Sequence, residues 1–326
     1  MIVPEFWAEA RQHHRDAQRQ ITVRRFGWSN ESESEALEMA QARAAEALAR
    51  ALAGEKIERR ERKAAYNGAF GVPIREEILS RHGEEVITRN AYGAHCLNTP
   101  RALFADIDFE PSARGKDALL AFGVLAFGCA MVGLQSHRWG LAAGLIFISV
   151  FLSSPVASFV RQRVTALRGG ASHVARQRIT TYLASHPDWH LRLYRTPAGL
   201  RLLATHQPFE PQAPEVQRFF AAVGADPVYV RMCLNQRCFR ARLTAKPWRA
   251  GITGHMRPRP GLWPVDPARR PVRDAWVARY EATAAGFASC QFLESLGSGT
   301  VHPALLPVVE LHDRESRALQ GDLPLA

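Results

Sequence analysis

The stretch LFADIDFEP, residues 103–111, combines an apolar strand pattern with three acids, Asp106, Asp108 and Glu110. Soon after it comes ALLAFGVLAFG, residues 118–128, which has the composition of a membrane-spanning helix. In a strand, residues at i, i+2 and i+4 share a face, so the three carboxylates point to one side. The sequence therefore predicts an acid cluster at the end of a strand, close to a membrane.

Two uncharged blocks, residues 118–134 and 139–160, are separated only by QSHR. At about 1.5 Å per residue they extend roughly 26 Å and 33 Å, against about 30 Å for the hydrocarbon core of a bilayer. Such a short link predicts an antiparallel transmembrane hairpin. The alternative is a pair of buried core helices in a soluble protein.

Lys and Arg residues gather outside the hairpin, and its turn holds only Arg138. By the positive-inside rule, both termini face the cytoplasm and the turn lies on the other side of a bacterial-type inner (plasma) membrane. We expect residues 1–116 and 161–326 to form one cytoplasmic domain, interrupted by a hairpin at 117–160. The first residues, MIVPEFWAEARQHH, lack the pattern of a signal peptide.

The 326 residues carry a formal charge of +11, which favours anionic partners such as nucleic acid, nucleotides or an anionic leaflet. A solvated basic surface is the alternative. Five scattered Cys, an odd number, argue against a disulfide framework.

Local patterns predict an α+β domain with a mostly antiparallel, palm-like sheet. Strands are expected at 20–26, 85–89, 94–97, 101–108, 228–232 and 238–243, a β-hairpin at 190–205 around TPAG, helices at 36–52, 171–185, 216–223 and 274–296, and a Pro-rich loop at 247–271.

The acids are suited to hold a hard cation, because Mg²⁺ and Mn²⁺ prefer carboxylate oxygens and relieve the repulsion between them. We expect Asp106, Asp108 and Glu110 to be metal ligands, and Asp106, Asp108 and Asp226 to be the catalytic acids. A metal at such a site would drive phosphoryl transfer.

Basic residues downstream suit the phosphates of a nucleotide. The candidate substrate-binding residues are Arg195, Thr196, Gly199, Arg201, Arg240, Arg242 and Lys246. Arg240 and Arg242 share a strand face, so a basic stripe beside the acids is expected.

This order of motifs resembles the archaeo-eukaryotic primase superfamily. Asp106 and Asp108 in LFADID match its first motif, TPAGLR its second, with Arg201 where the family has His, and Asp226 in GADP its third. The resemblance implies a palm-like core related to the RNA-recognition fold. It also implies that acids hold Mg²⁺ or Mn²⁺ and that the second motif's turn contacts the nucleotide.

Three functions remain open. The first is a membrane-anchored, metal-dependent nucleotidyltransferase of primase-polymerase type. The second is a non-catalytic membrane protein whose cytoplasmic domain binds a partner, with the acids paired to Arg residues. The third is an Asp-x-Asp glycosyltransferase that acts on a lipid acceptor. The sequence also places His312 next to Asp313, with no evident nucleophile to pair with them.

Overall fold

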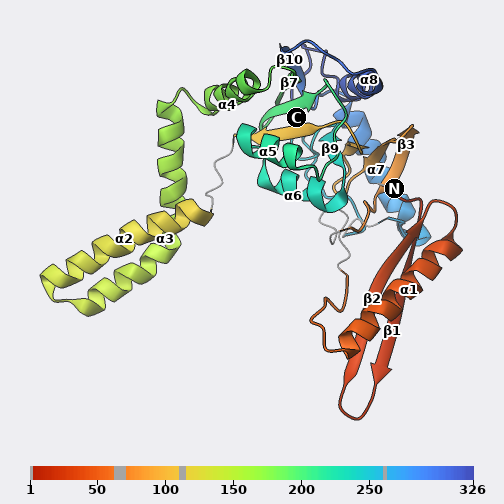
Figure 1. The fold of residues 1–326 in the computed structure, drawn as a ribbon, viewed down its shortest axis with the longest axis horizontal. Coiled ribbons are helices and arrows are strands. Elements are labelled where there is room, and N and C mark those ends of the chain that lie inside the picture. Colours follow the sequence, from red (N-terminus) through yellow and green to blue (C-terminus); the bar gives the residue numbers. More distant parts are fainter. Residues whose placement is uncertain (1–2, 62–70, 110–114, 260–262) are drawn as a thin grey trace.

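The computed structural model describes residues 3–61, 71–109, 115–259 and 263–326, and only the backbone of residues 115 and 116. It confirms an α+β chain with antiparallel sheets (Figure 1). The described strands form three sheets, ordered β1-β2, β10-β7-β8-β6 and β3-β4-β5-β9, and every pairing between them is antiparallel.

The N-terminal unit consists of β1 (Phe6–Arg15), β2 (Gln20–Ser29) and α1 (Glu33–Leu52). Ser32 caps α1 by accepting from the backbone N–H of Glu35, three residues after the cap. Helix and ribbon approach closely at Gly27, where an added Cβ would lie 2.0 Å from the carbonyl oxygen of Ala36. Glycine at this position therefore sets the packing of α1 on β2.

Two four-stranded sheets form the centre of the molecule. One contains β3 (Glu77–His82), β4 (Glu85–Arg89), β5 (His95–Thr99) and β9 (Phe239–Arg242). The other contains β6 (Phe104–Asp108), β7 (His190–Thr196), β8 (Gly199–Ala204) and β10 (Gln291–Gly297).

Helices pack around these sheets: α4 (Ala171–Ser185), α5 (Pro214–Val223), α6 (Pro227–Gln236), α7 (Arg270–Ala284) and α8 (Leu306–Ser316). A single core cluster joins Leu97 of β5 and Phe104 of β6 to Ile179 of α4, Phe219 of α5 and Val308 of α8. Ile107 lies in the same core, so the acids on either side of it point to the opposite face of β6.

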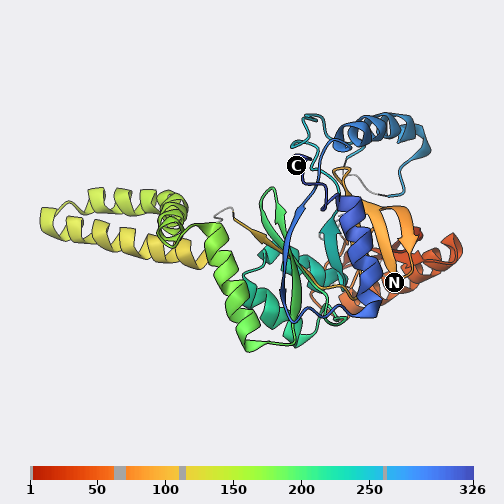
Figure 2. The ribbon, with the colours of Figure 1, turned by 90° about the horizontal axis from the view of Figure 1, so that it is seen from above.

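Two long apolar helices leave the sheets after β6: α2 (Gly115–Ser136) and α3 (Trp139–Leu167). They run side by side in opposite directions, with Asp117 Oδ2 3.3 Å from a guanidinium nitrogen of Arg161 and Cys129 Sγ 3.7 Å from Ser149 Oγ. Figure 2 shows them projecting to one side, with α4 leading back to the sheets. Both helices are long and apolar enough to cross a membrane, and most of each is not buried in the protein.

Several predicted elements differ from the structure. The expected strand 228–232 is part of helix α6, because Asp226 caps it and Pro227 occupies its first turn. The helix expected at 274–296 ends at Ala284, and β10 follows as an edge strand whose residues are only partly buried. The strand β1 was not expected. Helix α3 continues past residue 160 to Leu167.

We predict that Gly27→Ala destabilises the full chain in detergent by about 1–3 kcal/mol, because α1 must move away from β2 to admit the methyl group. The measurement is thermal unfolding followed by circular dichroism. Gly321→Ala is the matched control, since an added Cβ there meets no atom within 4 Å. Equal melting curves for the two variants would show that the close approach at Gly27 is not needed.

Candidate functional site

The acid strand and the second motif face each other directly, because β6 pairs with β8 so that Asp106 lies opposite Arg201. Arg201 donates from Nε to Asp106 Oδ1 at 2.7 Å and from Nη2 to Oδ2 at 3.1 Å. The arginine side chain is 2% exposed and the carboxylate 30%. Both oxygens of the first predicted metal ligand are thus held in a bidentate ion pair.

Arg201 also joins the two four-stranded sheets. Its Nη1 donates to the backbone carbonyl of Arg242 on β9 at 2.9 Å. Burial by itself would lower the pKa of Arg201, but the charge and hydrogen bonds of Asp106 raise it overall. Arg201 therefore stays cationic, and it acts as a structural tie between β6, β8 and β9.

The other two predicted metal ligands lie beyond Asp106. Asp108 is exposed at the end of β6, opposite Gly199. An added Cβ at Gly199 would lie 2.0 Å from the carbonyl oxygen of Ile107, so glycine is required for this close strand contact. Thr196 Oγ1 accepts from the Gly199 N–H at 3.0 Å and steadies the turn, while Arg195 is exposed. Glu110 lies outside the described residues.

Asp226 does lie beside the acid strand, since its backbone N–H donates to the carbonyl of Asp106 at 2.8 Å. Its carboxylate, however, is the N-cap of α6 and accepts from Val228 N at 3.3 Å and Tyr229 N at 3.0 Å. The structure therefore brings the third motif next to the first and gives its carboxylate a helix-capping role.

Lys246 and Arg242 gather on the acid side of the site. Burial lowers the pKa of Lys246, and the charges of Arg242 and Arg249 lower it further, whereas Asp108 and Asp106 oppose the shift. Lys246 Nζ also lies 5.6 Å from the centre of the Trp248 ring, within cation–π range. This basic cluster and the two acids are close enough to act on one another electrostatically.

Arg240 does not belong to that cluster, because its guanidinium donates to Glu76 at 2.5 Å. The two side chains are 3% and 0% exposed, so the pair is fully enclosed. Arg240 instead holds β9 against the start of β3. The expected basic stripe on β9 is therefore not continuous, because Arg240 is enclosed with Glu76 whereas Arg242 lies near Lys246.

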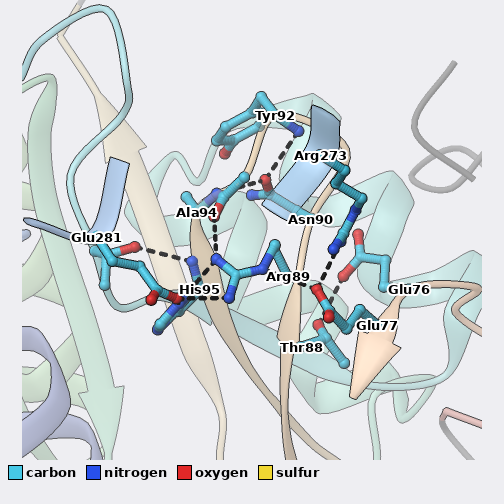
Figure 3. A network of polar contacts seen from close by, with 12 residues as sticks. Glu76, Glu77, Thr88, Arg89, Asn90, Tyr92, Ala94, His95, Arg273 and Glu281 are labelled. Atoms are coloured by element: carbon cyan, nitrogen blue, oxygen red, sulfur yellow. Dashed lines mark hydrogen bonds and ion pairs between the residues drawn. The ribbon is translucent and has the colours of Figure 1, made fainter. Parts of the chain in front are cut away.

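A second polar network, which the sequence did not reveal, lies at one end of the β3-β4-β5-β9 sheet, where Arg89 is the register partner of both Glu77 and His95 (Figure 3). Buried Arg89 donates to Glu77 at 2.8 Å and to Glu281 of α7 at 2.6 Å. Arg273 of α7 reaches Glu77 as well, at 2.6 Å. His95 lies beside them. Burial lowers the pKa of His95 most, and the charge of Arg89 lowers it further. The network fixes α7 on the sheet.

His312 and Asp313 do have a potential nucleophile beside them. Cys290 Sγ lies 3.8 Å from His312 Nε2, and His312 Nδ1 lies 3.0 Å from Asp313 Oδ1. Burial raises the pKa of Cys290, but His312 and Arg201 lower it overall. This order of groups is that of a Cys-His-Asp triad. Cys290 and His312 are both 0% exposed, so they form part of the core and not an accessible centre.

The carboxylates of Asp106 and Asp226 already have partners in this arrangement. A cation on Asp106 would share its carboxylate oxygens with Arg201, and one on Asp226 would compete with the amides of α6. Within the described residues no group of three or more His, Cys, Asp or Glu side chains is placed to hold a metal ion. The residues brought together here are two acids and several cations.

Comparisons with protein-family models, with curated proteins and with solved structures found no match for this chain.

We predict that Asp106→Asn lowers the free energy of unfolding by about 3–5 kcal/mol, because it leaves Arg201 charged and buried without its counter-ion. The double variant Asp106→Asn/Arg201→Met should lose less than the sum of the single changes. Chemical unfolding of the full chain in detergent measures both values. The exposed Asp322→Asn should stay within about 0.5 kcal/mol of the wild type.

An unchanged stability of Asp106→Asn would remove the structural explanation for this acid and favour a functional one. If Asp106→Asn is as stable as the wild type, the ion pair contributes nothing to folding, and the carboxylate is not retained for that purpose.

Proposed function

We propose that this chain is a membrane-anchored protein whose cytoplasmic α+β domain acts by binding a ligand or partner and not by metal-dependent catalysis. The observation that carries the proposal is the bidentate ion pair between buried Arg201 and half-buried Asp106. An acid that must hold a metal during catalysis keeps its oxygens available to that metal. Here both oxygens are used to join strands.

The anchoring part of the proposal rests on α2 and α3. Their length, their apolar composition and their exposed surfaces suit a lipid environment, since an apolar face of this size is not stable in water. The positive charges indicate how the hairpin is oriented in the membrane. Arg161, Arg163 and Arg168 follow the apolar part of α3, whereas the turn between the helices has only Arg138. The sheets and both termini would then lie in the cytoplasm.

A second candidate is the nucleotidyltransferase that the primase resemblance implies. The basic cluster favours it, because Lys246 lies within electrostatic range of Asp106 and Asp108, and Arg242 within range of Asp106. Such cations are suited to the phosphates of a nucleotide. In this function Asp106 and Asp108 would hold Mg²⁺ or Mn²⁺.

The proposed topology predicts which residues are accessible from outside an intact cell. His137→Cys, in the turn between α2 and α3, should react with a membrane-impermeant maleimide in intact cells. Arg15→Cys, at the end of β1, should react only after lysis. Background labelling should be low, since Cys96, Cys233, Cys238 and Cys290 are buried and Cys129 lies within the apolar part of α2. Labelling of Arg15→Cys in intact cells would contradict the topology.

The two candidate functions differ in their response to nucleotides. We expect no rise in the melting temperature of the full chain in detergent when Mn²⁺ and a nucleoside triphosphate are added, compared with Mn²⁺ alone. A catalytic site would be stabilised by about 2.7 kcal/mol at a hundred times the dissociation constant. A rise that Asp108→Asn removes would favour the nucleotidyltransferase and end the binding-protein proposal.

A further inference from the structure

A large cavity lies between the acid strand and the base of the helical hairpin. It has a volume of about 1030 Å³, and its walls come from the end of β6, from α2, α3 and α4, and from the segment that joins α5 to α6. We call it the junction cavity. A pocket of this size accommodates a complete small ligand or a substantial part of a larger one.

The lining of the junction cavity changes character from one end to the other. Toward the middle of the hairpin it is apolar, with Leu120 and Val124 from α2 and Val156 and Val160 from α3. Toward the sheets it becomes charged. Its charged lining residues are Asp108, Asp117, Arg161, Arg168, Arg178 and Asp226. A ligand for this cavity needs an apolar part and a charged part.

The charges of the lining do not cancel one another locally. Asp117 is paired with Arg161, and the carboxylate of Asp226 caps α6. Asp108 acts on Lys246. Arg168 and Arg178 are exposed, and neither guanidinium group makes a hydrogen bond or ion pair with any residue in the part of the chain that the structure describes. Two guanidinium groups are therefore available to an anion at the charged end.

Gly224 contributes to the position of Arg178. Gly224 is the C-cap of α5 and has a φ of +75°. A Cβ built on Gly224 would lie 2.4 Å from Arg178 Nη1. The guanidinium therefore rests directly over the glycine backbone. Glycine is required here both for the left-handed backbone and for the space that the arginine occupies. This contact keeps one cation at the edge of the cavity.

From these features we propose that the junction cavity binds an anionic phospholipid, with its phosphate between Arg168 and Arg178 and an acyl chain along the apolar wall of α2 and α3. The proposal rests on the membrane anchoring proposed above, which places the charged end at the level of the lipid headgroups. Guanidinium groups bind phosphate oxygens through paired hydrogen bonds. Basic pockets on the cytoplasmic side of membrane helices commonly recognise lipid headgroups.

The unpaired charges of Arg168 and Arg178 also determine which lipid headgroup the cavity should prefer. The guanidinium groups of Arg168 and Arg178 have no carboxylate partner among the described residues, so a headgroup that brings a second cation next to them is disfavoured. Phosphatidylglycerol should consequently bind more tightly than phosphatidylcholine, and inorganic phosphate, which lacks the apolar part, more weakly than either.

The test is a titration of the full chain in a non-ionic detergent with short-chain phosphatidylglycerol, followed by native mass spectrometry. Arg168→Gln/Arg178→Gln should weaken binding at least tenfold, which corresponds to about 1.4 kcal/mol. The control Arg163→Gln/Arg218→Gln removes the same charge from α3 and α5 at exposed positions outside the cavity lining, and should bind as the wild type does.

A second variant tests the cavity while keeping every charge. Val164→Trp places a larger side chain in the lining at an exposed position of α3, and should also weaken binding. Binding of the arginine double variant within twofold of the wild type would overturn the proposal, and so would an equal loss in the control. Equal affinity for phosphatidylcholine or for inorganic phosphate would overturn the assignment to an anionic lipid.

Failure of this site and failure of the anchoring are distinguishable. If His137→Cys is labelled from outside and the arginine double variant still binds lipid normally, only the lipid site is wrong. If the labelling pattern fails, the membrane topology is wrong regardless of the titration.

Discussion

A guanidinium almost entirely removed from water is tolerated only where its charge and its donors are satisfied, and Arg201 is such a group. Asp106 on β6 satisfies its charge, and the carbonyl of Arg242 on β9 takes a further donor. The two partners belong to different sheets. The requirements of one side chain therefore fix how β6, β8 and β9 meet, and this junction also positions the acids, the basic cluster and the start of the hairpin.

Ion pairs between an arginine and a carboxylate also join distant segments elsewhere in the protein. Arg240 is enclosed with Glu76, and Arg192 donates to Asp313 at 2.5 Å. Each pair joins segments far apart in the sequence. Arginine suits this purpose better than lysine, because its planar group satisfies two oxygens at once. Part of the basic excess of the chain thus lies inside the fold, which makes a net charge of +11 a weaker guide to a binding surface than its size suggests.

Local patterns were sufficient to predict most strands and helices, including the hairpin around TPAG and the two apolar helices. Local patterns failed where they were ambiguous. Val228 and Val230 suit a strand, but these residues form a helix because Asp226 caps it. The site was harder to predict. The order of the motifs assigned Asp106 and Arg201 to one site, yet only the strand register shows that they neutralise each other. The approach of Cys290 to His312 depends on tertiary packing and has no sequence pattern.

The strands β6 and β8 are neighbours in one sheet, yet the paired side chains are 95 positions apart and the whole apolar hairpin lies between them. At roughly 5–20 residues per second, a ribosome needs roughly 5–20 seconds to cover that distance. In the proposed topology, the hairpin enters the bilayer during this interval, before β8 exists. Pairing of β6 with β8 then follows insertion, so a hairpin that fails to insert leaves β6 without its neighbouring strand and Asp106 without Arg201.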